Sequence, residues 1–159
     1  MQNIKRKIIL GSDHAGFLLK EAIKLHLSSN AYENTLEIID CGCDSEKSVD
    51  YPDHANAVAT EVLKNPENKG ILVCGSGIGI SIAANKVNGI RCALVHDYLS
   101  SKLSRQHNDS NIISIGAGFV GKELAKNIVD VYLATEFTGE ERHQRRIDKM
   151  SEIEKNNPK

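Results

Sequence analysis

The sequence predicts an α/β protein, a three-layer α/β/α sandwich built on a five-stranded parallel sheet. Two observations carry this prediction. Five short apolar runs alternate along the chain with stretches in which apolar residues recur every three or four positions, the patterns of a buried strand and of one helix face. The third run also ends in a glycine-rich turn that leads directly into a helical stretch. Strands that alternate with helices are typical of the crossover units that build a parallel sheet.

The apolar runs place the strands, and the helical spacing places the helices. Strands are expected at residues 7–12, 36–40, 70–74, 90–95 and 111–115. Helical stretches are expected over residues 19–27, 51–63, 80–87, 98–106, 120–131 and 142–153. Asp50 is in position to cap the second helix, since Pro52 suits a first turn, and His107 to Asp109 should stop the fourth. We expect a single domain over residues 1–159.

Composition narrows the class of protein. Lys and Arg number 20 against 21 Asp and Glu, so nothing in the net charge points to a nucleic-acid partner. The first residues do not resemble a signal peptide, and no stretch is long and apolar enough to span a membrane. Four cysteines in such a chain favour a reducing, cytoplasmic location. Cys41 and Cys43 are too close together for a zinc site of paired ligands, so we expect no metal at this pair.

The chemistry is expected around the third strand, where Cys74 is the last residue before Gly75, Gly77 and Gly79. A glycine turn that opens a helix presents backbone N–H groups that have no intrahelical partner and favour negative charge. A thiol beside such donors should have its thiolate form favoured. The stretch therefore predicts an anion cradle next to a nucleophile or base, although a cysteine at a strand end is more often a packing residue.

Other polar groups should collect at the carboxyl edge of the sheet, where α/β proteins bind ligands. Asp13 and His14 follow the first strand, His96 and Asp97 follow the fourth, and His107 with Asn108 precedes the fifth. We expect acid, imidazole, thiol and N–H donors to converge there. Taken singly, each has a simpler interpretation: Asp13 caps the first helix, and His107 complements a helix dipole.

Two nucleotide-binding interpretations are weak. A Walker A loop ends in Gly-Lys-Ser/Thr, and Gly79-Ile80-Ser81 lacks the lysine. The dinucleotide fingerprint requires a third glycine where Ile80 stands, and it normally follows the first strand. Asp97 lies about twenty residues further on, where dinucleotide-binding proteins have an acidic residue that binds the ribose. NAD binding is therefore not excluded outright.

Five motifs in order carry a resemblance over nearly the whole chain. They are 11–16 (GSDHAG), 50–52 (DYP), 74–86 (CGSGIGISIAANK), 104–109 (SRQHND) and 142–146 (RHQRR). Together they resemble the type B ribose-5-phosphate isomerases. The resemblance implies a Rossmann-like fold, a homodimer or dimer of dimers with sites drawn from two subunits, and neither a metal nor a cofactor. It implies an aldose–ketose isomerase that interconverts ribose 5-phosphate and ribulose 5-phosphate in the non-oxidative pentose phosphate pathway.

The resemblance also implies roles. Cys74 would be the base that moves a proton between C1 and C2, because Ile80 stands where a subgroup has a glutamate base. His107, with Asp13 nearby, would open the furanose ring. The implied substrate-binding residues are His14, Tyr51, Gly75, Ser76, Gly77, Ile78, Gly79, Ser81, Asn108, Arg142 and Arg146. The chain differs from many relatives at Gly118, where they carry an arginine.

Alternatives remain at this stage. The substrate could be a six-carbon sugar phosphate, such as allose or galactose 6-phosphate, or the chain could be a non-catalytic sugar-phosphate or nucleotide-binding module. Arg142 and Arg146 share a helix face and suit a phosphate dianion, or they pair with Glu140 and Glu141. The last helix has a thin apolar seam of Ile147, Met150 and Ile153, which predicts docking on a partner subunit.

Overall fold

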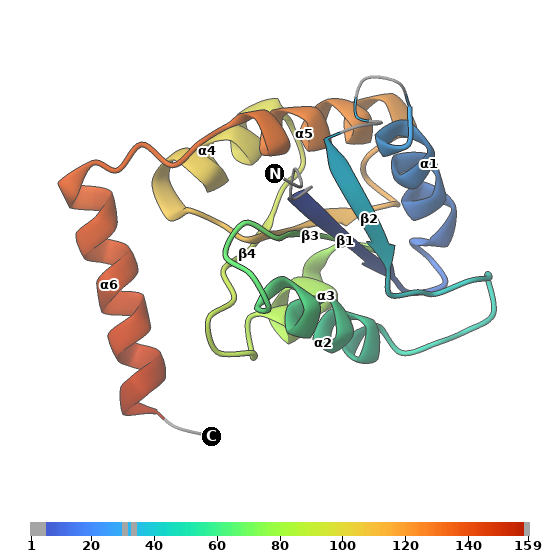
Figure 1. Ribbon diagram of the computed structural model, residues 1–159. Coiled ribbons are helices and arrows are strands. Elements are labelled where there is room, and N and C mark those ends of the chain that lie inside the picture. The colour runs from blue at the N-terminus through green and yellow to red at the C-terminus, as the bar shows by residue number, and fades with distance from the viewer. Residues whose placement is uncertain (1–5, 30–31, 33–34, 158–159) are drawn as a thin grey trace, which may run out of the picture.

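A computed structural model of the chain describes residues 6–29, 32 and 35–157. Within them, five strands form one parallel sheet in the order β2-β1-β3-β5-β4 (Figure 1). The strands are β1 (Arg6–Ser12), β2 (Leu36–Asp40), β3 (Lys69–Cys74), β4 (Cys92–Leu94) and β5 (Ile112–Gly116). The predicted parallel sheet and the Rossmann-like α/β architecture are therefore confirmed.

Helices cover both faces of the sheet. They are α1 (Phe17–Leu27), α2 (Tyr51–Val62), α3 (Ile78–Ala84), α4 (Tyr98–Asn108), α5 (Lys122–Ala134) and α6 (Glu141–Asn156). Helices α1 and α5 pack together on one face, with α4 beside α5, and α2 packs with α3 on the other face. None of the described helices combines the length and the apolarity that crossing a lipid bilayer requires.

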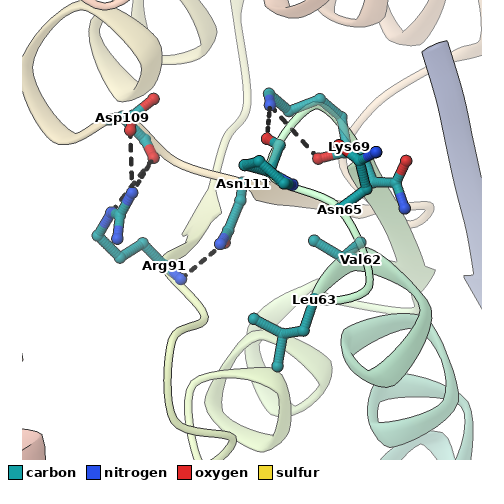
Figure 2. A pocket seen from close by; sticks show the side chains of 9 residues that line it. Val62, Leu63, Asn65, Lys69, Arg91, Asp109 and Asn111 are labelled. Atoms are coloured by element: carbon teal, nitrogen blue, oxygen red, sulfur yellow. Dashed lines mark hydrogen bonds and ion pairs between the residues drawn. The ribbon is translucent and has the colours of Figure 1, made fainter. Parts of the chain in front are cut away.

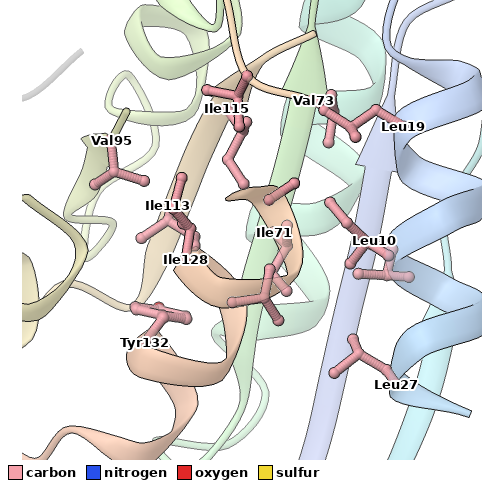
Figure 3. Packing of buried hydrophobic residues seen from close by; sticks show 14 of the residues in the cluster. Leu10, Leu19, Leu27, Ile71, Val73, Val95, Ile113, Ile115, Ile128 and Tyr132 are labelled. Atoms are coloured by element: carbon pink, nitrogen blue, oxygen red, sulfur yellow. The ribbon is translucent and has the colours of Figure 1, made fainter. Parts of the chain in front are cut away.

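Alternation along the strands explains why both faces are apolar. Successive side chains of a strand point to opposite faces, and in β3 Ile71 and Val73 join the cluster under α1 and α5 (Figure 3), whereas Leu72 and Cys74 join the cluster under α2 and α3. All residues of β3 are buried. Cys74 is thus at the end of the central strand, on the side of α2 and α3.

The elements whose boundaries differ from the prediction include β4, α3 and α4. Strand β4 is only Cys92–Leu94, because it is an edge strand that pairs with β5 alone. Helix α3 ends at Ala84, so Val87 lies in the following turn. Helix α4 includes His107 and ends at Asn108, and the C-cap residue Asp109 adopts a left-handed conformation with φ of 44°.

Helix α6 stands to one side of the sandwich (Figure 1). Only two of its residues, His143 and Ile147, are buried. Met150 and Ile153 of the predicted apolar seam are 39% and 61% exposed. Near its end, the Glu154 carboxylate accepts from the Gly89 N–H at 3.1 Å. The helix therefore leaves most of its apolar seam uncovered by its own chain.

Candidate active site

The first part of the site is the turn after β1. The Asp13 N–H donates to the Val73 carbonyl at 3.2 Å, so the turn is held against β3. The Asp13 carboxylate accepts from the Gly16 N–H at 2.9 Å, which closes the turn before α1. The N-cap of α1 is Gly16, without a side-chain cap bond, so the simpler interpretation of Asp13 as the helix cap is wrong. A side chain at Gly16 would place its Cβ 2.4 Å from the Val73 carbonyl oxygen, so this close approach requires glycine.

The second part is the glycine loop between β3 and α3. The Gly77 N–H donates to Cys74 Sγ at 3.1 Å, and the Ile78 N–H donates to Ser76 Oγ at 3.2 Å. Gly77 has a left-handed φ of 76°, which glycine adopts without strain. In this conformation the loop turns back, and the N–H dipole of Gly77 points at the sulfur of Cys74. Cys74 is only 4% exposed.

The predicted cradle is smaller than the sequence indicated. The amides of Gly77 and Ile78 already donate within the loop. The Ser81 N–H bonds to the Gly77 carbonyl at 3.3 Å, and its hydroxyl bonds to the Ile78 carbonyl at 2.7 Å. Gly79 and Ile80 are in the first turn of α3, where N–H groups have no intrahelical acceptor. They are the amides best placed to receive an anionic oxygen.

Tyr51 and His14 complete this edge. The Tyr51 ring covers Gly79 so closely that a Cβ there would be 2.6 Å from the ring, and Tyr51 itself is 38% exposed. Asp50 occupies the N-cap position of α2 without a side-chain cap bond. His14 Nδ1 lies 3.2 Å from the Val49 N–H, so the loop before α2 fixes this imidazole when Nδ1 is the acceptor.

The remaining predicted residues gather elsewhere, where α4 meets α6. The rings of His107 and His143 stack with centroids 4.2 Å apart and planes inclined by 15°. Asn108 is exposed beside them, and Arg142 and Arg146 are exposed on α6. Arg142 Nε donates to Glu140 at 2.9 Å, the ion pair that the sequence had offered as the alternative.

His143 has an unusual environment within this group. It is 3% exposed, and its Nε2 has no hydrogen-bond partner among the described residues. Burial lowers the pKa of His143, and the neighbouring His107, Arg142 and Arg146 lower that pKa further. His143 is therefore held as a neutral ring against His107.

These two groups of residues lie at opposite edges of the sheet. The Asn111 carbonyl, just after α4, accepts from the Gly70 N–H at the start of β3, whereas Cys74 ends that strand. A strand rises about 3.3 Å per residue, so the two edges are on the order of 13 Å apart. The expectation that His107 and Asn108 converge with Cys74 within one chain is therefore wrong, because residues that precede a parallel strand lie at its amino edge.

Other predicted neighbours have structural roles. The Asp97 side chain accepts from the Ser100 N–H at 2.7 Å and caps α4 in a capping box. These bonds also lower its pKa. The Gly118 N–H donates to the Gly75 carbonyl at 2.9 Å, and a Cβ at this position would be 3.1 Å from that oxygen. The glycine therefore keeps the turn after β5 against the active-site loop.

Sequence reasoning missed Arg91 and His143. Arg91 Nε donates to the Asn108 carbonyl at 2.9 Å, and Arg91 Nη2 donates to the Asp109 carbonyl at 2.8 Å. It therefore holds the end of α4 that carries His107 and Asn108. His143 lies between Arg142 and Arg146, so the RHQRR motif contained the signal. Nothing local in the sequence marks Arg91.

A parallel sheet with a thiol and a glycine loop at one edge, and imidazoles with arginines at the other, carries the kinds of acid–base and phosphate-binding groups that a sugar-phosphate isomerase requires. The chain matches the Ribose/Galactose Isomerase family over residues 8–150, and it belongs to this family. It is 46% identical over 149 residues to Ribose-5-phosphate isomerase B of Escherichia coli, covering 94% of this chain and 97% of that protein.

Solved structures agree with the family assignment. The ribose-5-phosphate isomerase B of Clostridium thermocellum has 48% identity and a TM-score of 0.87, with 94% of this chain and 98% of that chain covered. The type B ribose 5-phosphate isomerase of Trypanosoma brucei has 41% identity and a TM-score of 0.88, with 94% and 99% covered. The resemblance inferred from the five motifs is confirmed at the level of the family and the fold.

Proposed function

We propose that the chain interconverts ribose 5-phosphate and ribulose 5-phosphate through an enediolate, at a site shared by two copies. The observation that carries this proposal is the division of the required groups between the two edges of one sheet. Cys74 and its loop lie at one edge, and His107, Arg142 and Arg146 lie at the other. Two copies related by a twofold axis would bring opposite edges together twice.

Each group has a task in this reaction. The Cys74 thiolate takes the proton from C2 of the open-chain aldose and returns it to C1. The amides of the loop, Gly79 above all, stabilise the charge on the enediolate oxygen, an interaction for which the loss of one donor typically costs about 100- to 1,000-fold in rate. Asp13 is fixed beside the loop by its bond to Gly16.

The residues at the amino edge would act on a partner's substrate. His107 transfers the proton that opens the furanose ring, Asn108 orients the sugar, and Arg142 and Arg146 bind the phosphate. His14 and Tyr51, from the chain that carries Cys74, line the same site. Phosphate binding by a guanidinium fork holds C1 and C2 under the sulfur, so remote binding energy serves the chemical step.

The partner, in this proposal, is a second copy of the chain, as a homodimer or a dimer of dimers. Ile78 and Ile82 lie one turn apart on α3, next to the glycine loop, and are 51% and 55% exposed. Met150 and Ile153 on α6 are exposed as well. Both groups of site residues therefore have uncovered apolar surface on a neighbouring helix. The balanced charge, 20 basic against 21 acidic residues, supports a protein that binds no nucleic acid, and the four cysteines support a cytoplasmic location.

A direct assay tests the function. Purified protein is given ribose 5-phosphate, allose 6-phosphate or galactose 6-phosphate, each with a chelator present, and kcat/KM is measured for each. We expect turnover of ribose 5-phosphate with the highest kcat/KM and no effect of the chelator. Binding without turnover of any of the three would contradict the proposal, and so would a higher kcat/KM for a six-carbon substrate.

A further inference from the structure

A cavity of about 280 Å³ opens at the amino edge of the sheet, between the end of α2 and the segment that precedes β4 (Figure 2). Lys69, the first residue of β3, lies along its wall, and Arg91 and Asp109 line it from the other side. None of the roles proposed above uses Lys69. Lys69 is buried, with only 6% of its surface exposed, and a buried lysine normally needs a compensating partner.

The chain provides its own comparison in Lys20. Lys20 is 1% exposed, and its Nζ lies 2.7 Å from both Asp40 and Glu21. Lys69 Nζ donates instead to two main-chain carbonyls, those of Pro66 at 3.2 Å and Asn68 at 3.3 Å. Within the part of the chain that the structure describes, no carboxylate lies within ion-pair distance of Lys69 Nζ. A carbonyl accepts a hydrogen bond from an amine without neutralising an ammonium.

Charged groups of both signs act on Lys69, and the two arginines among them act more strongly than the two carboxylates. Arg105 from α4 and Arg6 from β1 act against its ammonium form, and Asp109 and Glu67 favour that form more weakly. The Asp109 carboxylate is already occupied, because it accepts from Arg105 Nη1 at 2.7 Å and from Arg91 Nη2 at 3.1 Å. The cluster therefore contains more cations than carboxylates.

We propose that Lys69 is a nucleophilic amine and a site of covalent acylation, taking acyl groups from anionic acyl donors of the acyl phosphate class. The cavity gives the donor a place beside the Lys69 side chain, and the Arg91 guanidinium that lines the cavity attracts its phosphate. The amine lone pair attacks the acyl carbon, the bond from that carbon to the phosphate oxygen breaks, and inorganic phosphate leaves. The nitrogen loses one proton to solvent, and the product is an amide without charge.

The protonation equilibrium supports this proposal. Burial lowers the pKa of Lys69 to about 8, with Arg105 and Arg6 as the next causes. At pH 7.5 an amine of this pKa is roughly 200-fold richer in the neutral form than an ordinary lysine of pKa about 10.4. Because a weaker base is also a weaker nucleophile, we expect a rate advantage on the order of 10-fold.

The test is competitive labelling of the folded protein with acetyl phosphate, followed by quantitative mass spectrometry of the lysine peptides. Lys20 is the buried, paired control, and Lys64, whose side chain is 62% exposed and pairs with Glu61, is the accessible one. We expect Lys69 to label about 10-fold faster than Lys64 at pH 7.5, with a rate that levels off above pH 8. Equal or slower labelling of Lys69 would overturn the proposal.

Two further measurements separate reactivity from accidental access. Arg6→Gln removes one cation, so the Lys69 rate at pH 7.5 should fall several-fold while the Lys64 rate is unchanged. A neutral ester of N-hydroxysuccinimide should show a smaller preference for Lys69 than acetyl phosphate does. An unchanged Lys69 rate in Arg6→Gln, or an equal preference for the neutral reagent, would contradict the role of the cations. Circular dichroism confirms that the variant is folded.

Discussion

The two edges of the sheet differ in the chemistry that they carry. The carboxyl edge has a thiol, a carboxylate held by a backbone amide, and the first-turn amides of a short helix. The amino edge has two stacked imidazoles beside arginines. A proton transfer on a phosphorylated sugar needs both sets, since a base without a phosphate anchor cannot hold its substrate. Under the proposed function, this division requires a functional unit of more than one chain.

The largest effect is expected at the carboxyl edge. Cys74→Ala removes the proposed base, and a positioned general base contributes typically about 100- to 10,000-fold to the rate. Turnover of ribose 5-phosphate should therefore fall below detection, while the circular dichroism spectrum and the oligomeric state are unchanged. A steady-state assay at saturating substrate measures this loss.

Cys74→Ser is the matched control for that variant. It retains an acceptor for the Gly77 N–H but not the acidity of a thiol, so it should fold normally and remain inactive. Near wild-type turnover in either variant would remove Cys74 from the mechanism.

Mixing two inactive variants tests the division between edges directly. Cys74→Ala and His107→Ala each destroy every site in their own dimers. In a mixed dimer with twofold symmetry, one site receives both substitutions and the other receives neither. Unfolding and refolding a 1:1 mixture should therefore restore about a quarter of the wild-type activity.

If that mixture stays inactive although mixed dimers form, the proposal that each site is shared by two copies is contradicted. Native mass spectrometry, with one variant isotopically labelled, verifies their formation. Refolding each variant alone should give no activity, which controls for recovery by any other route.

A smaller effect is expected from the phosphate anchor. Arg142→Ala should raise KM about 10-fold with little change in kcat, since the phosphate is bound equally in the ground and transition states. Arg145→Ala is the matched control, because Arg145 is an exposed arginine of the same helix to which we assign no phosphate contact. Equal KM values in the two variants would exclude the anchoring role of Arg142.

The sequence predicted the elements and the carboxyl edge well, for a physical reason. Apolar alternation and glycine spacing are local, and Asp13, Tyr51 and Cys74 all lie at strand or helix ends that those patterns define. His107 was misplaced because it was grouped with residues that follow strands. It precedes β5, and in a parallel sheet this order alone assigns it to the other edge.

Features that depend on tertiary contacts were beyond reach of the sequence. The stack of His107 on His143 joins residues from α4 and α6, and the Arg91 bonds to the end of α4 join segments on either side of β4. Backbone torsions also determine which amides of the glycine loop are already hydrogen-bonded within the loop. The Gly77 N–H points at Cys74 only in the left-handed conformation of Gly77.

The smallest expected effect is on the free energy of unfolding. It compares two buried lysines, Lys69 at the amino edge and Lys20 near the carboxyl edge. The pKa of Lys69 is lowered to about 8 in the folded chain, against about 10.4 unfolded. Between these values the unfolded chain binds more protons, so the contribution of Lys69 to stability increases as pH rises through this window. From pH 7 to 9.5, the wild type should gain about 1 kcal/mol relative to Lys69→Met, less than the full shift implies because solvent screens part of it.

Lys20→Met is the matched control, because it leaves the Asp40 carboxylate without its buried partner. Two lysines and a backbone N–H lower the pKa of Asp40 against the opposing effect of its burial, so this charge stays ionised throughout the same range. Lys20→Met should therefore destabilise the protein by a similar amount at both pH values. Urea unfolding at pH 7 and 9.5 gives both differences. A stability difference between the wild type and Lys69→Met that does not change with pH would mean that the pKa of Lys69 is not lowered in the folded protein.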